Sequence, residues 1–192
     1  MEDFVIWGER YQEGSCVIQN PEGFGDQFLL MEGVELLNQW PENVSCRMDN
    51  EYPKDIQLTD NLFGGDYPVI SSRLKDQIAA LAGASKIEFL PVSILNHKGR
   101  VASKDYFILN PLGTVDCIDI DKSGVVWNAI NATHISRVKQ LVLKKDAVPA
   151  EAGIVRPTHL AEAILLRRSL SDRLSSDGFT GLFFREPAKF RG

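Results

Sequence analysis

The chain has few cysteines and no long hydrophobic run. Its three cysteines, Cys16, Cys46 and Cys117, lie far apart, are odd in number and form no Cys-x-x-Cys pair. This spacing predicts neither a disulfide framework nor a zinc knuckle, and it suits a reducing compartment. No apolar run approaches the roughly 20 residues that a membrane helix needs, and the first residues are acidic where a secretory signal would be basic. We therefore expect a cytoplasmic protein with no membrane segment.

The motifs of several common enzyme classes are also missing. The sequence has no Gly-x-Ser-x-Gly, no His-Glu-x-x-His and no phosphate-binding Gly-x-x-x-x-Gly-Lys. Gly23-Phe24-Gly25 lacks the third glycine of a dinucleotide loop, and the Asp26 that follows would repel a pyrophosphate. The basic residues are scattered and the isoelectric point is about 5.3, which argues against nucleic acid as a ligand. The sequence thus predicts no catalytic residue, no cofactor and no metal.

Charge is distributed unevenly along the 192 residues, whose formal net charge is −5. Residues 1–60 hold 3 Lys and Arg against 13 Asp and Glu, a net charge of −10, whereas residues 61–192 hold 18 against 13, a net charge of +5. Such a division either creates an acidic face that attracts a basic partner or is ordinary solvated surface.

The hydrophobic pattern predicts an α+β fold with a mainly antiparallel sheet and two short helices packed on it. Residues 66–192 form the core domain, and residues 1–65 an irregular acidic N-terminal lobe that is either separate or continuous with it. Helices are expected at 72–82 and 170–177, each begun by a serine, Ser169 in the second case, and ended by a glycine. The segment 159–168 fits a helix or a strand. The expected strands are 87–95, 104–110, 114–120, 138–143 and 181–185.

Carboxylates concentrate in DCIDIDKSG, residues 116–124. Apolar and acidic residues nearly alternate there, which indicates a strand that ends in a turn. Asp119, Asp121 and Ser123 also match the first half of a calcium loop. Position 12 of that loop is Ile130, however, where a bidentate glutamate is needed. We therefore interpret these residues as a strand and a turn.

Two further side chains have alternative interpretations. His159 and Glu162, spaced i and i+3, fit half a metal site or a surface pair, and the surface pair is favoured. Cys117 fits a nucleophile with a distant histidine or a small core residue, and its apolar surroundings favour the core.

Six segments occur in a fixed order across roughly residues 67–187: PVISSRLKDQI, IEFLPVSIL, DYFILNPLGTVDCIDIDKSG, QLVLKKD, GIVRP and SDRLSSDGFTGLFFREP. Together they resemble immunity family eleven of the bacterial polymorphic toxin systems. The resemblance implies a non-catalytic protein that binds and neutralises a cognate toxin encoded by a neighbouring gene, without a cofactor. It carries no set of binding residues. The alternative hypothesis is a small carboxylate- or metal-dependent hydrolase that uses Asp116 to Asp121 with one histidine.

Four residues of the acidic N-terminal part are candidates for binding a partner protein: Glu32, Glu35, Trp40 and Glu42. Acidic side chains steer a basic partner, and aromatic anchors dominate binding energies while rim charges contribute little each. Trp40 fits the core equally well. Nothing in the sequence indicates whether the chain forms a homo-oligomer.

Overall fold

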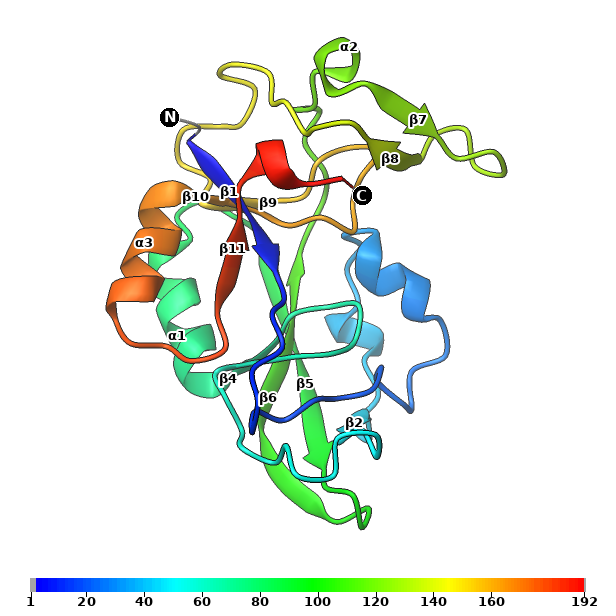
Figure 1. Ribbon diagram of the computed structural model, residues 1–192, viewed down its shortest axis with the longest axis vertical. Coiled ribbons are helices and arrows are strands. Elements are labelled where there is room, and N and C mark those ends of the chain that lie inside the picture. Colours follow the sequence, from blue (N-terminus) through cyan, green and yellow to red (C-terminus); the bar gives the residue numbers. More distant parts are fainter. Residues whose placement is uncertain (1–2, 192) are drawn as a thin grey trace.

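The computed structural model describes residues 3–191, and Figure 1 shows how their sheets and helices are arranged. One sheet has the order β11-β1-β10-β9, and a larger one has the order β2-β5-β6-β4-β3. The strands of the first are Phe183–Arg185 (β11), Phe4–Gly8 (β1), Leu165–Arg167 (β10) and Ile154–Val155 (β9). Those of the second are Ser45–Arg47 (β2), Ile87–Leu95 (β5), Val101–Pro111 (β6), Val69–Ser71 (β4) and Asn61–Leu62 (β3).

A two-stranded sheet and several helices complete the described residues. The small sheet joins Val125–Trp127 (β7) to Ile135–Val138 (β8). The α-helices are Ser72–Leu81 (α1), Ile120–Ser123 (α2) and Arg168–Ser176 (α3). The 3-10 helices are Gln27–Met31 (η1), Leu37–Gln39 (η2) and Pro187–Lys189 (η3).

The strands pair antiparallel with one exception among residues 3–191, the parallel pair of β2 and β5. The prediction of an α+β fold with a mainly antiparallel sheet is therefore confirmed. Strands from the first 65 residues also pair with later strands: β1 lies between β10 and β11, and β2 and β3 form the two edges of the larger sheet. Within the described residues, no helix is long and apolar enough to cross a membrane.

The long hairpin of β5 and β6 is the centre of the larger sheet, and its first strand has the predicted bounds. Pro91 lies inside β5 and lacks an amide proton. The structure accommodates it because β2 pairs with β5 only from Ser93 onward, which leaves Pro91 on a locally open edge. A bulge follows, where the register between β5 and β6 shifts after Val92.

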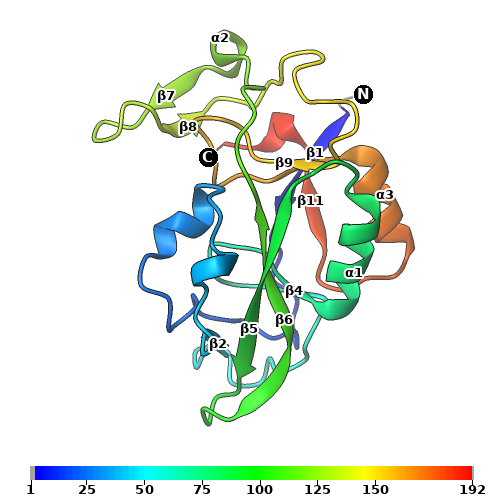
Figure 2. The same ribbon diagram turned by 180° about the vertical axis from the view of Figure 1, so that it is seen from behind.

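Helices α1 and α3 lie side by side on one flank of the molecule (Figures 1 and 2). The Oγ of Ser71 caps α1 by accepting the amide of Leu74 at 3.2 Å. Gly83 follows that helix with a φ of +64°, as the predicted glycine stop requires. Both predicted helices are confirmed, but the Ser169 cap is wrong. β10 runs directly into α3, so the N-cap position falls on Arg167, and Ser169 lies inside the helix.

Two predicted strands are wrong. Residues 114–119 make only single bridges, from Val115 to Pro157 and from Ile118 to Leu143, and α2 begins at Ile120. The strand predicted at 138–143 instead ends at Val138. The amides after it bond to the end of α2, with that of Lys139 donating to the carbonyl of Ser123 at 3.0 Å.

Candidate partner-binding surface

The acidic segment, defined here as residues 26–42, runs along one edge of the molecule and contains η1 and η2 (Figure 1). It carries Asp26, Glu32, Glu35 and Glu42, and no Lys or Arg occurs between residues 11 and 46. Between these acids stand exposed apolar side chains: Phe28 is 73% exposed, Leu37 51% and Val34 37%. Exposed apolar groups among charges of one sign are typical of a surface that binds another protein.

Arg156 fixes the first part of this segment from inside the protein. Its side chain is buried and donates to the carbonyls of Leu30 and Pro111, each at 2.9 Å, and to that of Ala161. Burial lowers the pKa of the guanidinium to about 10, so the group stays charged at neutral pH. Because those three carbonyls belong to distant parts of the chain, Arg156 ties η1 to the end of β6 and to the loop before β10.

Glu88 and Asn110 fix the second part. The Glu88 carboxylate, on β5, accepts the amides of Leu36 at 2.8 Å and Leu37 at 3.1 Å, the first donors of η2. The Asn110 side-chain amide donates to the carbonyl of Val34 at 2.9 Å and to Glu88 at 3.2 Å. A polar pair on the central hairpin thus replaces the side-chain cap that η2 lacks.

Gly33, between the two 3-10 helices, allows the segment to approach the protein closely. Its φ is +71°, and a Cβ there would lie 2.9 Å from the carbonyl oxygen of Gly113. Its own carbonyl accepts the Gly113 amide at 2.7 Å. Leu30 and Leu36, on either side, are buried in the core of the larger sheet. The backbone is therefore held at many points while the remaining side chains face outward.

The structure places all four predicted binding residues on or beside this surface. Glu32, Glu35 and Glu42 are exposed. Trp40 is half-buried: its ring centroid lies 4.7 Å from that of Phe24, and its Nε1 donates to the carbonyl of Pro91 at 2.8 Å. Sequence reasoning missed Phe28, Val34 and Leu37. The sequence signal that could have identified these three residues is their position among acidic residues on both sides of Gly33.

The carboxylates of residues 116–124 are used within the chain. Asp116 pairs with Lys144 at 2.7 Å. Asp119 caps α2 by accepting the amide of Lys122, and its carboxylate also pairs with the Lys122 ammonium group at 2.8 Å. These two bonds lower the pKa of the Asp119 carboxyl. Ser123 is buried, accepting the amide of Val142 at 3.0 Å, whereas Ile130 is 99% exposed. The turn predicted here is a capped helical turn, and its oxygens do not converge as in a calcium loop.

The structure also places the His159–Glu162 pair and Cys117, the two features with alternative interpretations in the sequence. Glu162 contacts His134, with 3.2 Å between Oε2 and Nε2, in place of the expected pair with His159. Across residues 3–191, no three His, Cys, Asp or Glu side chains come together as metal ligands. Cys117 is fully buried in the core, as predicted, and burial raises the pKa of its thiol to about 11, so it is a poor nucleophile at neutral pH.

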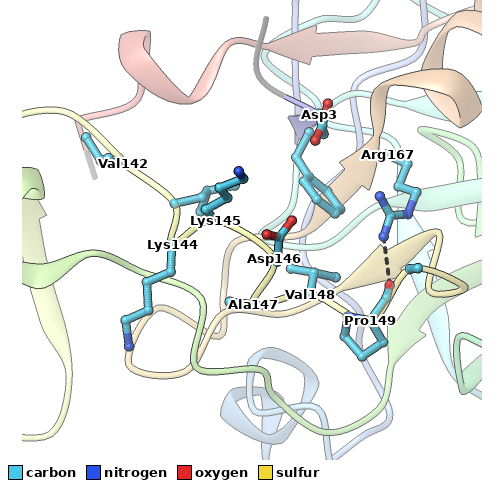
Figure 3. A pocket seen from close by; sticks show the side chains of 12 residues that line it. Asp3, Val142, Lys144, Lys145, Asp146, Ala147, Val148, Pro149 and Arg167 are labelled. Atoms are coloured by element: carbon cyan, nitrogen blue, oxygen red, sulfur yellow. Dashed lines mark hydrogen bonds between the residues drawn. The ribbon is translucent and has the colours of Figure 1, made fainter.

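A pocket of about 410 Å³ lies between residues 142–150 and the start of β1 (Figure 3). Arg167 is one of the basic residues that line this pocket. Its guanidinium donates to two carbonyls of the loop that forms the pocket wall, those of Pro149 at 2.7 Å and Ala152 at 2.9 Å. Lys144 points away from Arg167 in Figure 3 and pairs with Asp116. Arg167 and Lys144 therefore do not converge on the space between them.

The acidic segment, with exposed apolar and acidic side chains on an anchored backbone, is therefore the candidate partner-binding surface. No curated protein matches the chain. The model of the Immunity protein family (Imm11) matches residues 9–189. These residues include the acidic segment and all the strands except β1, which ends before residue 9. This match covers nearly the whole chain, and the protein therefore belongs to the Immunity protein family (Imm11).

Proposed function

We propose that this protein binds a cognate toxin through the acidic segment and neutralises it without catalysis, in the cytoplasm of the cell that makes both proteins. Membership of an immunity family supports the general role. The observation that carries the choice of surface is the anchored backbone of residues 26–42. Arg156, Glu88 and Asn110 hold it while apolar and acidic side chains remain exposed.

A surface of this kind fits a basic toxin surface, such as a site that binds an anionic substrate. The acids raise the encounter rate and orient the partner, and the apolar side chains supply most of the affinity. Phe28 and Leu37 are the best anchors, because they are the most exposed apolar side chains of the segment. A pre-ordered backbone reduces the entropy lost on binding. Covering the toxin's working surface is enough to block it, so no chemical step is needed.

The test is calorimetric titration of the toxin encoded by the neighbouring gene with the Phe28→Ala/Leu37→Ala variant. We expect the dissociation constant to rise about 100-fold or more, as for loss of central anchors. Ile56→Ala/Val101→Ala is the matched control, since it removes similarly exposed apolar groups elsewhere. A folded Phe28/Leu37 variant that binds as tightly as the parent would refute this surface. Failure of the parent itself to bind would refute the toxin as its partner.

A further inference from the structure

A second exposed apolar surface, of opposite charge, is formed by the β7–β8 hairpin, defined as residues 125–139. Val126 is 45% exposed, Trp127 40% and Ile130 99%. The hairpin contains Arg137 and Lys139, both exposed, and no acidic residue. Six of the ten large apolar side chains that are exposed among residues 3–191 lie in this hairpin or in the acidic segment. Exposure of this kind is therefore concentrated in two short stretches.

Val126 and Arg137 share one face of the hairpin. Val126 pairs with Arg137 in the antiparallel register, so their side chains project from the same side of the sheet. Neither Arg137 nor Lys139 takes part in an ion pair with another residue of the described chain, 3–191. The hairpin thus presents positive charge beside apolar groups, the counterpart of the acidic segment.

The two surfaces lie along the same edge of the molecule. The hairpin stands above the acidic segment on the right in Figure 1, and both move to the left in the reverse view of Figure 2. Residues 156–162 connect them: Arg156 bonds the carbonyl of Leu30, and the carbonyl of His159 accepts the amide of Ile135 at 2.8 Å. The His159 ring also packs on Trp127, with centroids 5.3 Å apart.

We propose that two copies of this chain pair through this edge, with the acidic segment of each copy against the β7–β8 hairpin of the other. When two complementary surfaces lie side by side on one protein, rotation of a second copy about a two-fold axis places each surface against its complement. Neither surface then remains free for a third copy, so assembly stops at the dimer. Nine residues of the acidic segment and ten of the hairpin are exposed in each copy, close to the about 20–30 residues per side that form a standard interface. Pairing covers Phe28, Leu37, Trp127 and Ile130 together, so the dimer and the proposed toxin complex exclude each other and the monomer is the form that binds the toxin.

Charge complementarity favours a second copy as the occupant. The acidic segment carries four acids and no base, and the hairpin carries two bases and no acid, so each surface finds its opposite on the same protein. The net charge of −5 opposes association of whole molecules, but charges farther apart than about 8–10 Å are largely screened at physiological salt. The local contacts therefore decide the outcome. The test requires this protein alone, so its result is separate from that for toxin binding.

The first measurement is sedimentation velocity of the parent over a range of protein concentrations at about 50 and 500 mM salt. We expect a reversible dimer whose dissociation constant rises at least about 10-fold at the higher salt, because the charge contacts are screened. A parent that remains monomeric at all concentrations and at both salt levels would overturn the proposal. A trimer or an open series of larger assemblies would overturn the two-fold arrangement.

A charge exchange then identifies the surfaces. Arg137→Glu/Lys139→Glu places acid against acid in its own dimer, and Glu32→Lys/Glu35→Lys places base against base, so each variant alone should be monomeric. An equimolar mixture restores both contacts and should form a mixed dimer. Lys98→Glu/Lys104→Glu, the same charge change on the β5–β6 hairpin, is the matched control and should still form the parental dimer. A mixture that stays monomeric, or a dimer unaffected by either exchange, would refute the pairing.

Ile130→Asp provides a variant without a folding defect, since this side chain is 99% exposed. It places a charge in the loop between β7 and β8, within the proposed contact, and we expect it to sediment as a monomer with the parental circular dichroism spectrum. Retention of the parental dimer by this variant would show that the hairpin is not the contact surface.

Discussion

Two stretches of this protein are rich in carboxylates, and the structure uses them in opposite ways. In residues 116–124, Asp116 and Asp119 pair with lysines of the same chain, and Asp119 also caps a helix. In the acidic segment, Glu32, Glu35 and Glu42 are exposed and form no ion pair with any other residue of the described range 3–191. A high density of acids therefore does not identify a site. What distinguishes the acidic segment is that three of its four acids, Glu32, Glu35 and Glu42, have no ion-pair partner among residues 3–191.

Of the variants that test this comparison, Arg156→Met is expected to lower the free energy of unfolding most, because it removes the buried anchor of the acidic segment. Three carbonyls lose their donor at once, and buried acceptors without partners cost about 1–3 kcal/mol each. We expect the free energy of unfolding, measured in urea, to fall by about 3–5 kcal/mol. Arg185→Met, at an exposed position of β11, is the control and should change it by less than about 0.5 kcal/mol. A loss below about 1 kcal/mol would contradict the anchoring described here.

Asp60 extends the comparison to an acid that is both paired and buried. Burial raises the pKa of its carboxyl, but Arg73, at 2.7 Å, and the amide and hydroxyl groups of Ser71 and Thr180 outweigh it and lower the pKa to about 2. These bonds join the residue before β3 to the start of α1 and to the loop before β11. We expect Asp60→Asn to cost about 2–3 kcal/mol at pH 7.

The pH dependence follows from the same lowered pKa. The ionised form is favoured in the folded protein, so the Asp60 contribution to stability is complete above pH 3.8 and is lost as pH falls toward 2. Thermal unfolding between pH 2 and 6 should therefore show the Asn variant approaching the parent at the acid end. A difference between the two proteins that stays constant down to pH 2 would contradict this account.

The smallest effects on stability are expected from variants in residues 116–124 and in the acidic segment, and these variants compare the two acid-rich stretches directly. Asp119→Ala removes a helix cap and a lysine contact, and we expect the melting temperature to fall by about 1–3 °C. The triple change Glu32→Gln/Glu35→Gln/Glu42→Gln removes only exposed charges and should leave the melting temperature unchanged within about 1 °C.

The effects of these variants on toxin association should be reversed. We expect the triple variant to associate about 10-fold more slowly at 50 mM salt, with a smaller difference at 200 mM. Asp119→Ala should associate at the parental rate. Stopped-flow measurements give the association rates of both variants and the parent. Equal association rates for the triple variant and the parent at both salt levels would show that the acidic segment does not steer binding.

Local patterns predicted those elements that local interactions determine. The strand Ile87–Leu95 and helix α1 follow from an apolar run and from a serine cap with a glycine stop. The strand expected at 114–120 failed because near-alternation of apolar and acidic residues also fits a segment that makes single bridges before a capped helix. The segment 159–168 fitted two structures, and β10 forms there because β1 and β9 pair with it on both sides.

The candidate surface was only partly predictable for the same reason. Its acids and Trp40 can be selected from charge and residue type. Nothing near Leu30 in the sequence shows that Arg156, 126 residues later, holds its carbonyl. Whether Leu37 is exposed and Leu36 buried likewise depends on Glu88 and the rest of β5.

The central position of β1 determines when its sheet can form during synthesis. The apolar strand Phe4–Gly8 is made well before Leu165–Arg167 and Phe183–Arg185, the strands with which it pairs. Contacts so distant in sequence form slowly, because a loop of nearly the whole chain must close before they contribute. A nascent chain thus carries an unpaired apolar strand until β10 and β11 have emerged. A chain cut after residue 182 would leave that sheet without β11, one of the two strands that flank β1.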